Sequence, residues 1–451
     1  MRRPYKIIFI LSLIIGIIGR FWGAWVNNES NDNHVEVVQR ILAHQLIDHK
    51  DSCWECFQPP LFYQAHASFS SISGADSRRE LIQQMQLVSA LMNLLAVYFI
   101  YLTFLNFFGK SMVTRIALCF ALLNPALFAM GIQGTNDMPV ILLGTIASWL
   151  LSVFLTKGKT SHLIAIGILA ILAAYIKGSG LAVFLMFSFW LVVLAIKSKK
   201  YLTLIIPIVG LILLVTQSQY RHSYNTYGNP FETNLFKPSP PPFFDDGKEF
   251  WARPGITSVW NSYGKFRLFN MLKMPYNINT SKGPNIPKHR TSFWSQMYGS
   301  FLDSRFLQHP YSWENKHPDR LNMTRVLFVL ALFLIAVLLI GMYMILRKLR
   351  MVKDFLSIES IYLSLFLGMM FFGLKYSYDY RDFGCIKATF ILPVLLPMMH
   401  IFAMGWRGLK QDKIKRIGRV VIFLILGIFA VDIFVLVREL TMIAYEYTAF
   451  V

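Results

Sequence analysis

The sequence has few charged residues and very few cysteines for its length. Only 15% of the 451 residues are charged, whereas 55% are hydrophobic, and the mean hydropathy is +0.48. This balance is typical of a polytopic membrane protein. Four cysteines are too few for a disulfide scaffold. The net charge of +20 does not indicate a nucleic-acid partner, because basic residues in a membrane protein mainly fix its topology.

Apolar runs of about the length that crosses a bilayer recur along the whole chain. They predict an all-α polytopic membrane protein with about eleven transmembrane helices. The first run, which follows "MRRPYK", resembles a signal peptide, but it has spanning length and no small-residue cleavage site follows it. We therefore expect it to stay as the first helix. The runs lie near residues 5–26, 84–108, 112–131, 138–156, 162–176, 179–196, 201–217, 324–346, 356–374, 385–406 and 418–438.

The short connections between these runs are basic on alternate sides of the count, as in "TKGKTSH", "KSKKY" and "RKLRMVKD". The positive-inside rule places them in the cytoplasm. The other side, a periplasm or lumen, then holds the loop 27–83 and the long segment 218–323. Three regions follow: a membrane module over 1–217 that includes the loop 27–83, the outer segment 218–323, and C-terminal membrane helices over 324–451.

The loop 27–83 is expected to contain an amphipathic helix at the membrane surface, because "HVEVVQRILAHQLI" has helical spacing of its apolar residues. The segment 218–323 is rich in Pro, Gly, Asn and aromatic residues. Loops of this length are usually functional or linkers. Its aromatic residues suit either sugar stacking or an interfacial belt.

Two acids are expected at the outer face. Asp32 lies about six residues after the first run, where a carboxylate is close enough to the membrane to act as general base on a lipid-linked substrate. The simpler interpretation is a cap for the helix that follows. Asp137 opens the fourth run on the same side. Glu29, His34 and Glu36 are candidates for a supporting role.

Three cations are expected at the same face: Lys177 in "YIKGSGL", and Arg381 and Lys387 in "YRDFGCIKATFILP". Charged residues near the membrane are costly and usually functional or paired, although Lys387 also suits snorkelling to the interface. Together they suit a phosphate leaving group, whose developing charge they would stabilise.

The string "CWEC" is the one close pair of cysteines. Outside the cytoplasm, Cys53 and Cys56 suit a redox pair, half of a zinc site or a disulfide. No second Cys/His pair with ligand spacing and no thioredoxin-like pattern accompany them. A small structural disulfide that braces the loop is therefore the preferred interpretation.

These motifs, in this order, resemble the GT-C superfamily of integral-membrane glycosyltransferases. The likeness rests on an outward acid after the first helix, "QPPLFY", an outward "TND", "YIKGSGL" and "KATFILPVLLP". It is closest to the branch of protein O-mannosyltransferases and aminoarabinose transferases and covers about the first 220 residues plus the late helix. By position Asp32 matches the family's base and Asp137 its second acid, and Lys387 occupies the place of a basic residue. The family's first acid is usually followed by Glu, but Asn33 stands here.

The resemblance implies transfer of a sugar from a polyprenyl-phosphate donor to a lipid, glycan or protein acceptor, at the outer face of a bacterial inner membrane or the endoplasmic reticulum. The chain lacks a nucleotide-binding Gly loop on its short basic connections, which disfavours a nucleotide-sugar donor. A transporter or flippase of a lipid-linked or anionic sugar is the main alternative, although no internal repeat is evident. A non-catalytic partner in a glycan-assembling complex is a third. The residues assign no metal ligands, and a divalent cation stays an open candidate.

The alternating basic connections predict a topology that reporter fusions can measure. A reporter fused after Lys200 should give a cytoplasmic signal, and one fused within 218–323 should give the signal of the outer compartment. The reverse result at either position would remove the basis for placing Asp32 and Asp137 on one outer face.

Overall fold

The computed structural model describes residues 3–45, 47, 52–230, 232, 260–275, 292–306, 318–349, 356–380 and 387–449. Every regular element within these ranges is a helix, so the all-α prediction is confirmed for this part of the chain. Arg381 lies outside the described residues.

Nine helices in the described ranges are long and apolar enough to cross a membrane, so the chain is an integral membrane protein. The remaining two predicted runs are also helical. One is α5 (Met112–Leu123) joined to α6 (Pro125–Gly131) at a bend of 53°, and the other is the shorter α8 (Thr160–Ile176). The nine are built from α1 (Arg3–Val26), α4 (Arg78–Phe108), α7 (Asp137–Lys157), α9 (Gly178–Lys197), α10 (Ile205–Gln217) with α11 (Gln219–Tyr227), α14 (Pro318–Leu330) with α15 (Leu332–Lys348), α16 (Ile358–Tyr380), η12 (Ala388–Val394) with α17 (Leu395–Gly408), and α18 (Asp412–Ala449).

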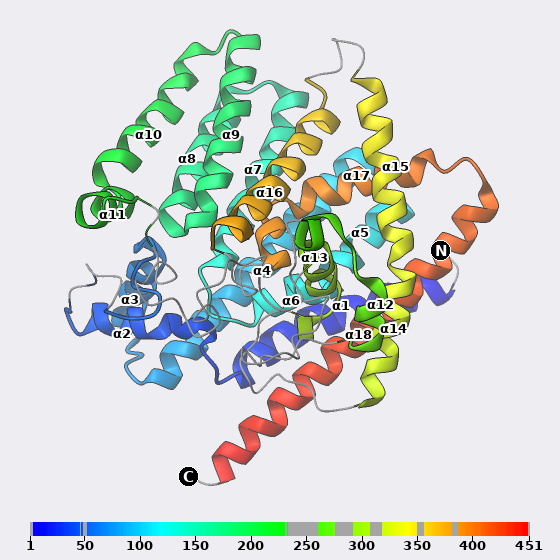
Figure 1. Ribbon diagram of the computed structural model, residues 1–451, viewed down its shortest axis with the longest axis horizontal. Coiled ribbons are helices and arrows are strands. Elements are labelled where there is room, and N and C mark those ends of the chain that lie inside the picture. Colours follow the sequence, from blue (N-terminus) through cyan, green and yellow to red (C-terminus); the bar gives the residue numbers. More distant parts are fainter. Residues whose placement is uncertain are drawn as a thin grey trace.

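The helices form two packed groups around a shared middle (Figure 1). One hydrophobic core joins α7, α8, α9 and α16 to the first loop, and α8 and α9 pack as a hairpin. The other core joins α1, α4, α5, α6, α17 and α18, with α1 and α18 side by side along the lower edge of the view. The element η12 contacts α6, α7 and α16, so it lies where the two groups meet.

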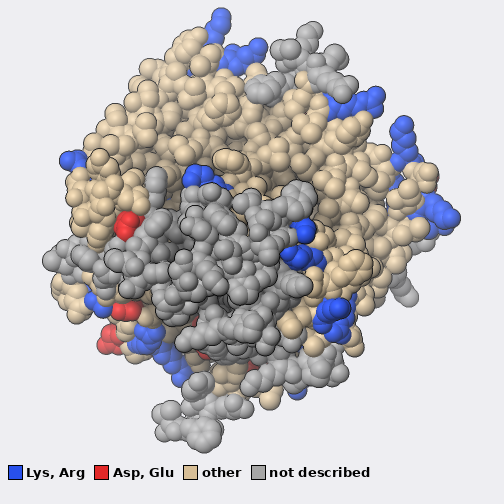
Figure 2. Space-filling model, in the orientation of Figure 1, with Lys and Arg blue, Asp and Glu red and all other residues tan. Residues whose placement is uncertain are grey.

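Basic side chains lie at the ends of several membrane-spanning helices. The C-terminal ends of α9 and α15, which carry Lys197 and Lys348, both lie at the top of Figure 1. On the face drawn in Figure 2, Lys and Arg lie along the upper and right-hand edges and also at the left and lower left, where the visible Asp and Glu lie too.

The first loop folds back onto the helices through α2 (His34–Leu42) and α3 (Leu61–Ser73). The apolar residues Val35, Val37 and Val38 of α2 are at most 1% exposed and belong to the first core. The predicted amphipathic helix is therefore present, but it ends at Leu42 and is shorter than "HVEVVQRILAHQLI" indicated.

Part of the segment 218–323 packs into the membrane module. It contains η6 (Trp260–Gly264), α12 (Leu268–Lys273), α13 (Phe293–Leu302) and η8 (Ser304–Phe306). Helix α13 contacts α6 and η12, and the Oγ of Ser300 accepts a hydrogen bond of 2.9 Å from the backbone N–H of Ala388. This helix therefore supports the start of η12 directly.

Arg20 is a fully buried cation in α1. Its guanidinium donates to the carbonyls of Leu122 and Ala121, where α5 ends before the bend, and to the side chain of Asn93 in α4. The ring of Phe128 lies 5.0 Å from the guanidinium carbon. A helix C-terminus carries partial negative charge, so Arg20 stabilises the end of α5 and joins three helices.

We expect Arg20→Gln to destabilise the protein by about 2–4 kcal/mol, because it leaves buried carbonyls without their donor. The measurement is the thermal unfolding midpoint and folded yield of the purified protein. Arg79→Gln, at an exposed site in α4, is the matched control and should unfold like the parent. Equal midpoints for the two variants would contradict this role of Arg20.

Candidate active site

Asp32 lies in a strained turn between α1 and α2. It belongs to η1 (Asn31–Asn33), where Asp32 and Asn33 have φ of 52° and 57°. Asp and Asn tolerate this left-handed region better than most residues, but two in succession are costly and typical of functional sites. The helix-cap interpretation of Asp32 is wrong: Asn33 occupies the N-cap without a side-chain cap bond, and Ser30 accepts from the N–H of Val35.

His34 follows at the start of α2 and is 2% exposed. Its Nδ1 lies 2.8 Å from the hydroxyl oxygen of Tyr63 in α3, and the two rings stack with their centroids 5.8 Å apart. Tyr63 is fully buried and accepts a hydrogen bond of 3.3 Å from the side chain of Asn136, just before α7. Tyr63 therefore fixes the His34 ring and connects the first loop to the start of the fourth span.

Glu55 comes from the "CWEC" string and is only 7% exposed. The sulfur atoms of Cys53 and Cys56 are joined in a disulfide, which closes a tight turn around Glu55. One oxygen of Glu55, one of Asp32 and one ring nitrogen of His34 all lie within 4.8 Å of one another.

Asp137 and Lys177 form an ion pair close to this group. The Nζ of Lys177 lies 2.7 Å from Oδ2 of Asp137, and both side chains are largely buried. Lys177 stands in extended backbone between α8 and α9. The turn requires Gly180, since a Cβ there would lie 1.8 Å from the carbonyl oxygen of Ala173. A Cβ at Gly178 would have no atom within 4 Å, so the backbone at the start of α9 is accessible.

Lys387 reaches the group from the far end of the sequence. Its Nζ lies 3.9 Å from Oδ2 of Asp32, whose side chain is 36% exposed. Residues from the first loop, the start of α7, the α8–α9 turn and the start of η12 thus meet at one place. We call this set the ionic cluster: Asp32, His34, Glu55, Tyr63, Asp137, Lys177 and Lys387.

The surroundings drive the pKa values of two acids in the ionic cluster apart. Burial, with the charge of Asp32 adding to it, raises the pKa of Glu55 to about 8, so this carboxyl is mostly protonated at pH 7. Burial acts on Asp32 in the same sense, but Lys387 and other positive groups outweigh it and hold its pKa below the usual value. Burial, with Lys177, lowers the pKa of His34 to about 4, which keeps the imidazole neutral. A separation of this kind is typical of acid and base assignments.

The structure brings Asp32, His34, Asp137, Lys177 and Lys387 together, as their common sidedness predicts. Two further candidates of the first loop have other contacts. Glu36 forms an ion pair of 2.9 Å with Arg40 and accepts from Asn33, while Glu29 is held through its backbone oxygen by Gln86.

Sequence reasoning missed Glu55 and Tyr63. Glu55 stands between the two cysteines of "CWEC", and no local pattern marks it as part of a site. Tyr63 appeared only as the last letter of "QPPLFY", and nothing local marks its contact with His34.

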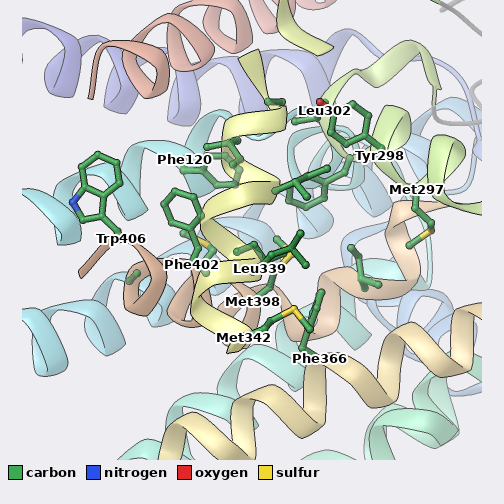
Figure 3. A pocket seen from close by; sticks show the side chains of 18 of the residues that line it. Phe120, Met297, Tyr298, Leu302, Leu339, Met342, Phe366, Met398, Phe402 and Trp406 are labelled. Atoms are coloured by element: carbon green, nitrogen blue, oxygen red, sulfur yellow. The ribbon is translucent and has the colours of Figure 1, made fainter. Parts of the chain in front are cut away.

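A large apolar cavity lies between α5, α13, α15, α16 and α17 (Figure 3). Its volume is about 600 Å³, and its lining is almost wholly hydrophobic, with Phe120, Met342 and Phe402 among the side chains drawn. Ile391 of η12, four positions after Lys387, and Met297 of α13 also line it. The element that begins beside the ionic cluster therefore also forms part of the cavity wall.

Comparison with known proteins gives one family match. Residues 58–219 match the family model described as dolichyl-phosphate-mannose-protein mannosyltransferase. The match confirms the resemblance to GT-C membrane glycosyltransferases over less than half of the chain. It contains Tyr63, Asp137 and Lys177 and leaves Asp32 and Lys387 outside. No curated protein matches the chain.

Two solved structures are distantly similar. The crystal structure of ArnT from Cupriavidus metallidurans in the apo state has 12% sequence identity and a TM-score of 0.37, with 89% of this chain and 76% of that chain covered. The crystal structure of the same protein bound to undecaprenyl phosphate has 12% identity and a TM-score of 0.35, with 90% and 79% covered. These values are too low to assign residues.

Replacing both cysteines by serine should lower the unfolding midpoint. Loop-closure entropy for so short a loop corresponds to about 2 kcal/mol. Residual activity per folded molecule should remain, because the sulfur atoms brace the turn and do not form part of the ionic cluster. Reductant added to the parent should reproduce the shift. Unchanged folding with complete loss of activity in Cys53→Ser with Cys56→Ser would indicate a redox or metal role instead.

Proposed function

We propose that this membrane protein is a glycosyltransferase that moves a sugar from a polyprenyl-phosphate donor to an acceptor on the outer, periplasmic or lumenal, face. The observation that carries the proposal is the ionic cluster, in which two carboxylates and two lysines from four separate segments meet at the start of η12, an element that also lines the apolar cavity. Gathering charges at a membrane surface is costly, so a function is the expected reason for it.

Asp32 is the proposed general base. Its depressed pKa keeps it ionised at neutral pH, and its side chain is exposed enough to meet a substrate. The acceptor hydroxyl attacks the anomeric carbon of the donor while its proton passes to Asp32. The bond between the anomeric carbon and the phosphate oxygen breaks, and polyprenyl phosphate leaves.

The lysines are proposed to bind the phosphate. A phosphate leaving group needs little protonation and benefits from fixed positive charge where its own charge develops. Lys387 lies beside Asp32, and Lys177 is oriented by Asp137. The open backbone at Gly178, at the start of α9, adds helix-start amides that favour an anion. Asp137 thus serves to position Lys177 and to complete the binding site of the acceptor.

The apolar cavity is proposed to hold part of the polyprenyl chain. Such a chain offers no hydrogen bonds, so a lining that is almost wholly hydrophobic suits it. With the phosphate at Lys387, the chain would follow η12 towards Ile391 into the cavity. The sugar then lies at the membrane surface, where the alternation of basic connections puts the outer compartment.

Asp32→Asn should lower the rate of sugar transfer by about a hundredfold to ten-thousandfold, because it removes the base while it keeps the shape of the side chain. Donor binding should change little. Lys387→Ala should weaken donor binding as well as turnover, since the ground-state phosphate is already charged. The measurement is sugar transfer from a polyprenyl-phosphate donor by purified, folded variants.

Asp76→Asn, at an exposed site before α4, is the matched control and should transfer sugar like the parent. Transfer at the parent rate by Asp32→Asn would contradict its role as base. Movement of the lipid-linked sugar across a vesicle membrane without any transfer product would favour the transporter instead.

A further inference from the structure

Asp32, His34 and Glu55 present two carboxylate oxygens and one ring nitrogen within 4.8 Å of one another. We propose that these three residues bind a divalent transition-metal ion. Metal–oxygen and metal–nitrogen bonds of about 2.0–2.2 Å put ligand atoms up to about 4 Å apart. The observed spacing therefore needs only a small contraction to enclose an ion.

Glu55 supplies the second, independent observation. Its Oε2 is buried and has no hydrogen-bond partner among the described residues, and the residue is 7% exposed. Buried polar atoms are nearly always satisfied, and an orphaned one points to a bound water or ion. The disulfide between Cys53 and Cys56 holds Glu55 in this turn, so the oxygen cannot easily swing out to water.

His34 is oriented as metal-binding histidines usually are. Its Nδ1 contacts the hydroxyl of Tyr63, which leaves Nε2 as the nitrogen available to a metal. When Nε2 binds an ion, Nδ1 carries the proton and donates to Tyr63, which also receives a hydrogen bond from Asn136. Such outer contacts fix the ring and usually tune metal affinity tenfold to a hundredfold.

The charges near the three ligands leave room for a cation. Lys177 is paired with Asp137, although its charge still acts on Asp32 and Glu55. The Nζ of Lys387 lies 3.9 Å from Asp32, which is beyond direct hydrogen-bond length. Binding of the ion would displace the proton of Glu55 into solvent. If the proposed donor is correct, Asp32, Glu55, Lys387, the divalent ion and the singly charged phosphodiester would then sum to neutrality. The inference rests on the proposed function only for that balance and for the role given next.

The ligand types indicate which ion fits. A nitrogen ligand beside two carboxylates suits Zn²⁺ or Mn²⁺, whereas Mg²⁺ and Ca²⁺ prefer oxygen ligands alone. Three protein ligands leave coordination positions open for substrate oxygens, as in catalytic sites. An acceptor hydroxyl bound there would lose its proton more readily, and Asp32 has a second oxygen to receive it.

The experiment titrates Mn²⁺ into purified full-length protein that a chelator has stripped, and follows free Mn²⁺ by electron paramagnetic resonance. The parent should bind one equivalent. Glu55→Gln should bind at least about tenfold more weakly, and Tyr63→Phe, which keeps the ring but loses its hydroxyl, should also weaken binding by about tenfold. Asp76→Asn is the matched control, because Asp76 is an exposed acid in the same loop and outside the ionic cluster, and it should bind like the parent.

Unfolding midpoints of all variants confirm that they are folded. No stoichiometric binding by the parent, or parent-like binding by Glu55→Gln, would overturn the metal site. Sugar transfer measured on the same stripped and reloaded samples separates the two proposals. Sugar transfer by a parent that binds no stoichiometric metal would leave the glycosyltransferase standing and the metal site refuted, whereas stoichiometric binding without any transfer would do the opposite.

Discussion

The apolar contact between the first loop and the membrane helices is the constraint on which the ionic cluster depends. Val35, Val37 and Val38 are almost fully buried against the first core, and each such side chain contributes about 1.5–3 kcal/mol. This burial offsets the cost of the left-handed turn at Asp32 and of desolvating Glu55. The ionic cluster therefore forms only when the first loop is packed against the membrane helices.

The membrane helices could be predicted because a bilayer imposes a length and a composition that are visible locally. Their ends were less predictable. Helix α4 begins at Arg78 rather than 84, since Ser77 and Glu80 form a capping box that extends it beyond the apolar run. The bend between α5 and α6 follows from Asn124 and Pro125, which cap and start a new helix inside one hydrophobic stretch.

Part of the candidate site could be predicted from the sequence. Asp32, Asp137, Lys177 and Lys387 stand out because charges at the ends of spans are rare, and sidedness alone predicts that they share a face. Glu55 does not stand out, because its position depends on a fold of the loop that no local pattern encodes. The left-handed turn at Asp32 cannot be predicted from the sequence, because "NDN" also suits a helix cap. In the structure, Asn33 instead contacts Glu36 nearby and Arg78 of α4.

The burial of Arg20 has a consequence for biogenesis. The carbonyl groups that receive its guanidinium belong to Ala121 and Leu122, a hundred residues further along the chain. At a synthesis rate of about 5–20 residues per second, several seconds pass between the synthesis of α1 and that of these two residues. During that interval Arg20 has to reach the polar edge of the bilayer by snorkelling. The final position of α1 is therefore reached only after α5 has been synthesised. Membrane integration of the first helix thus depends on α5.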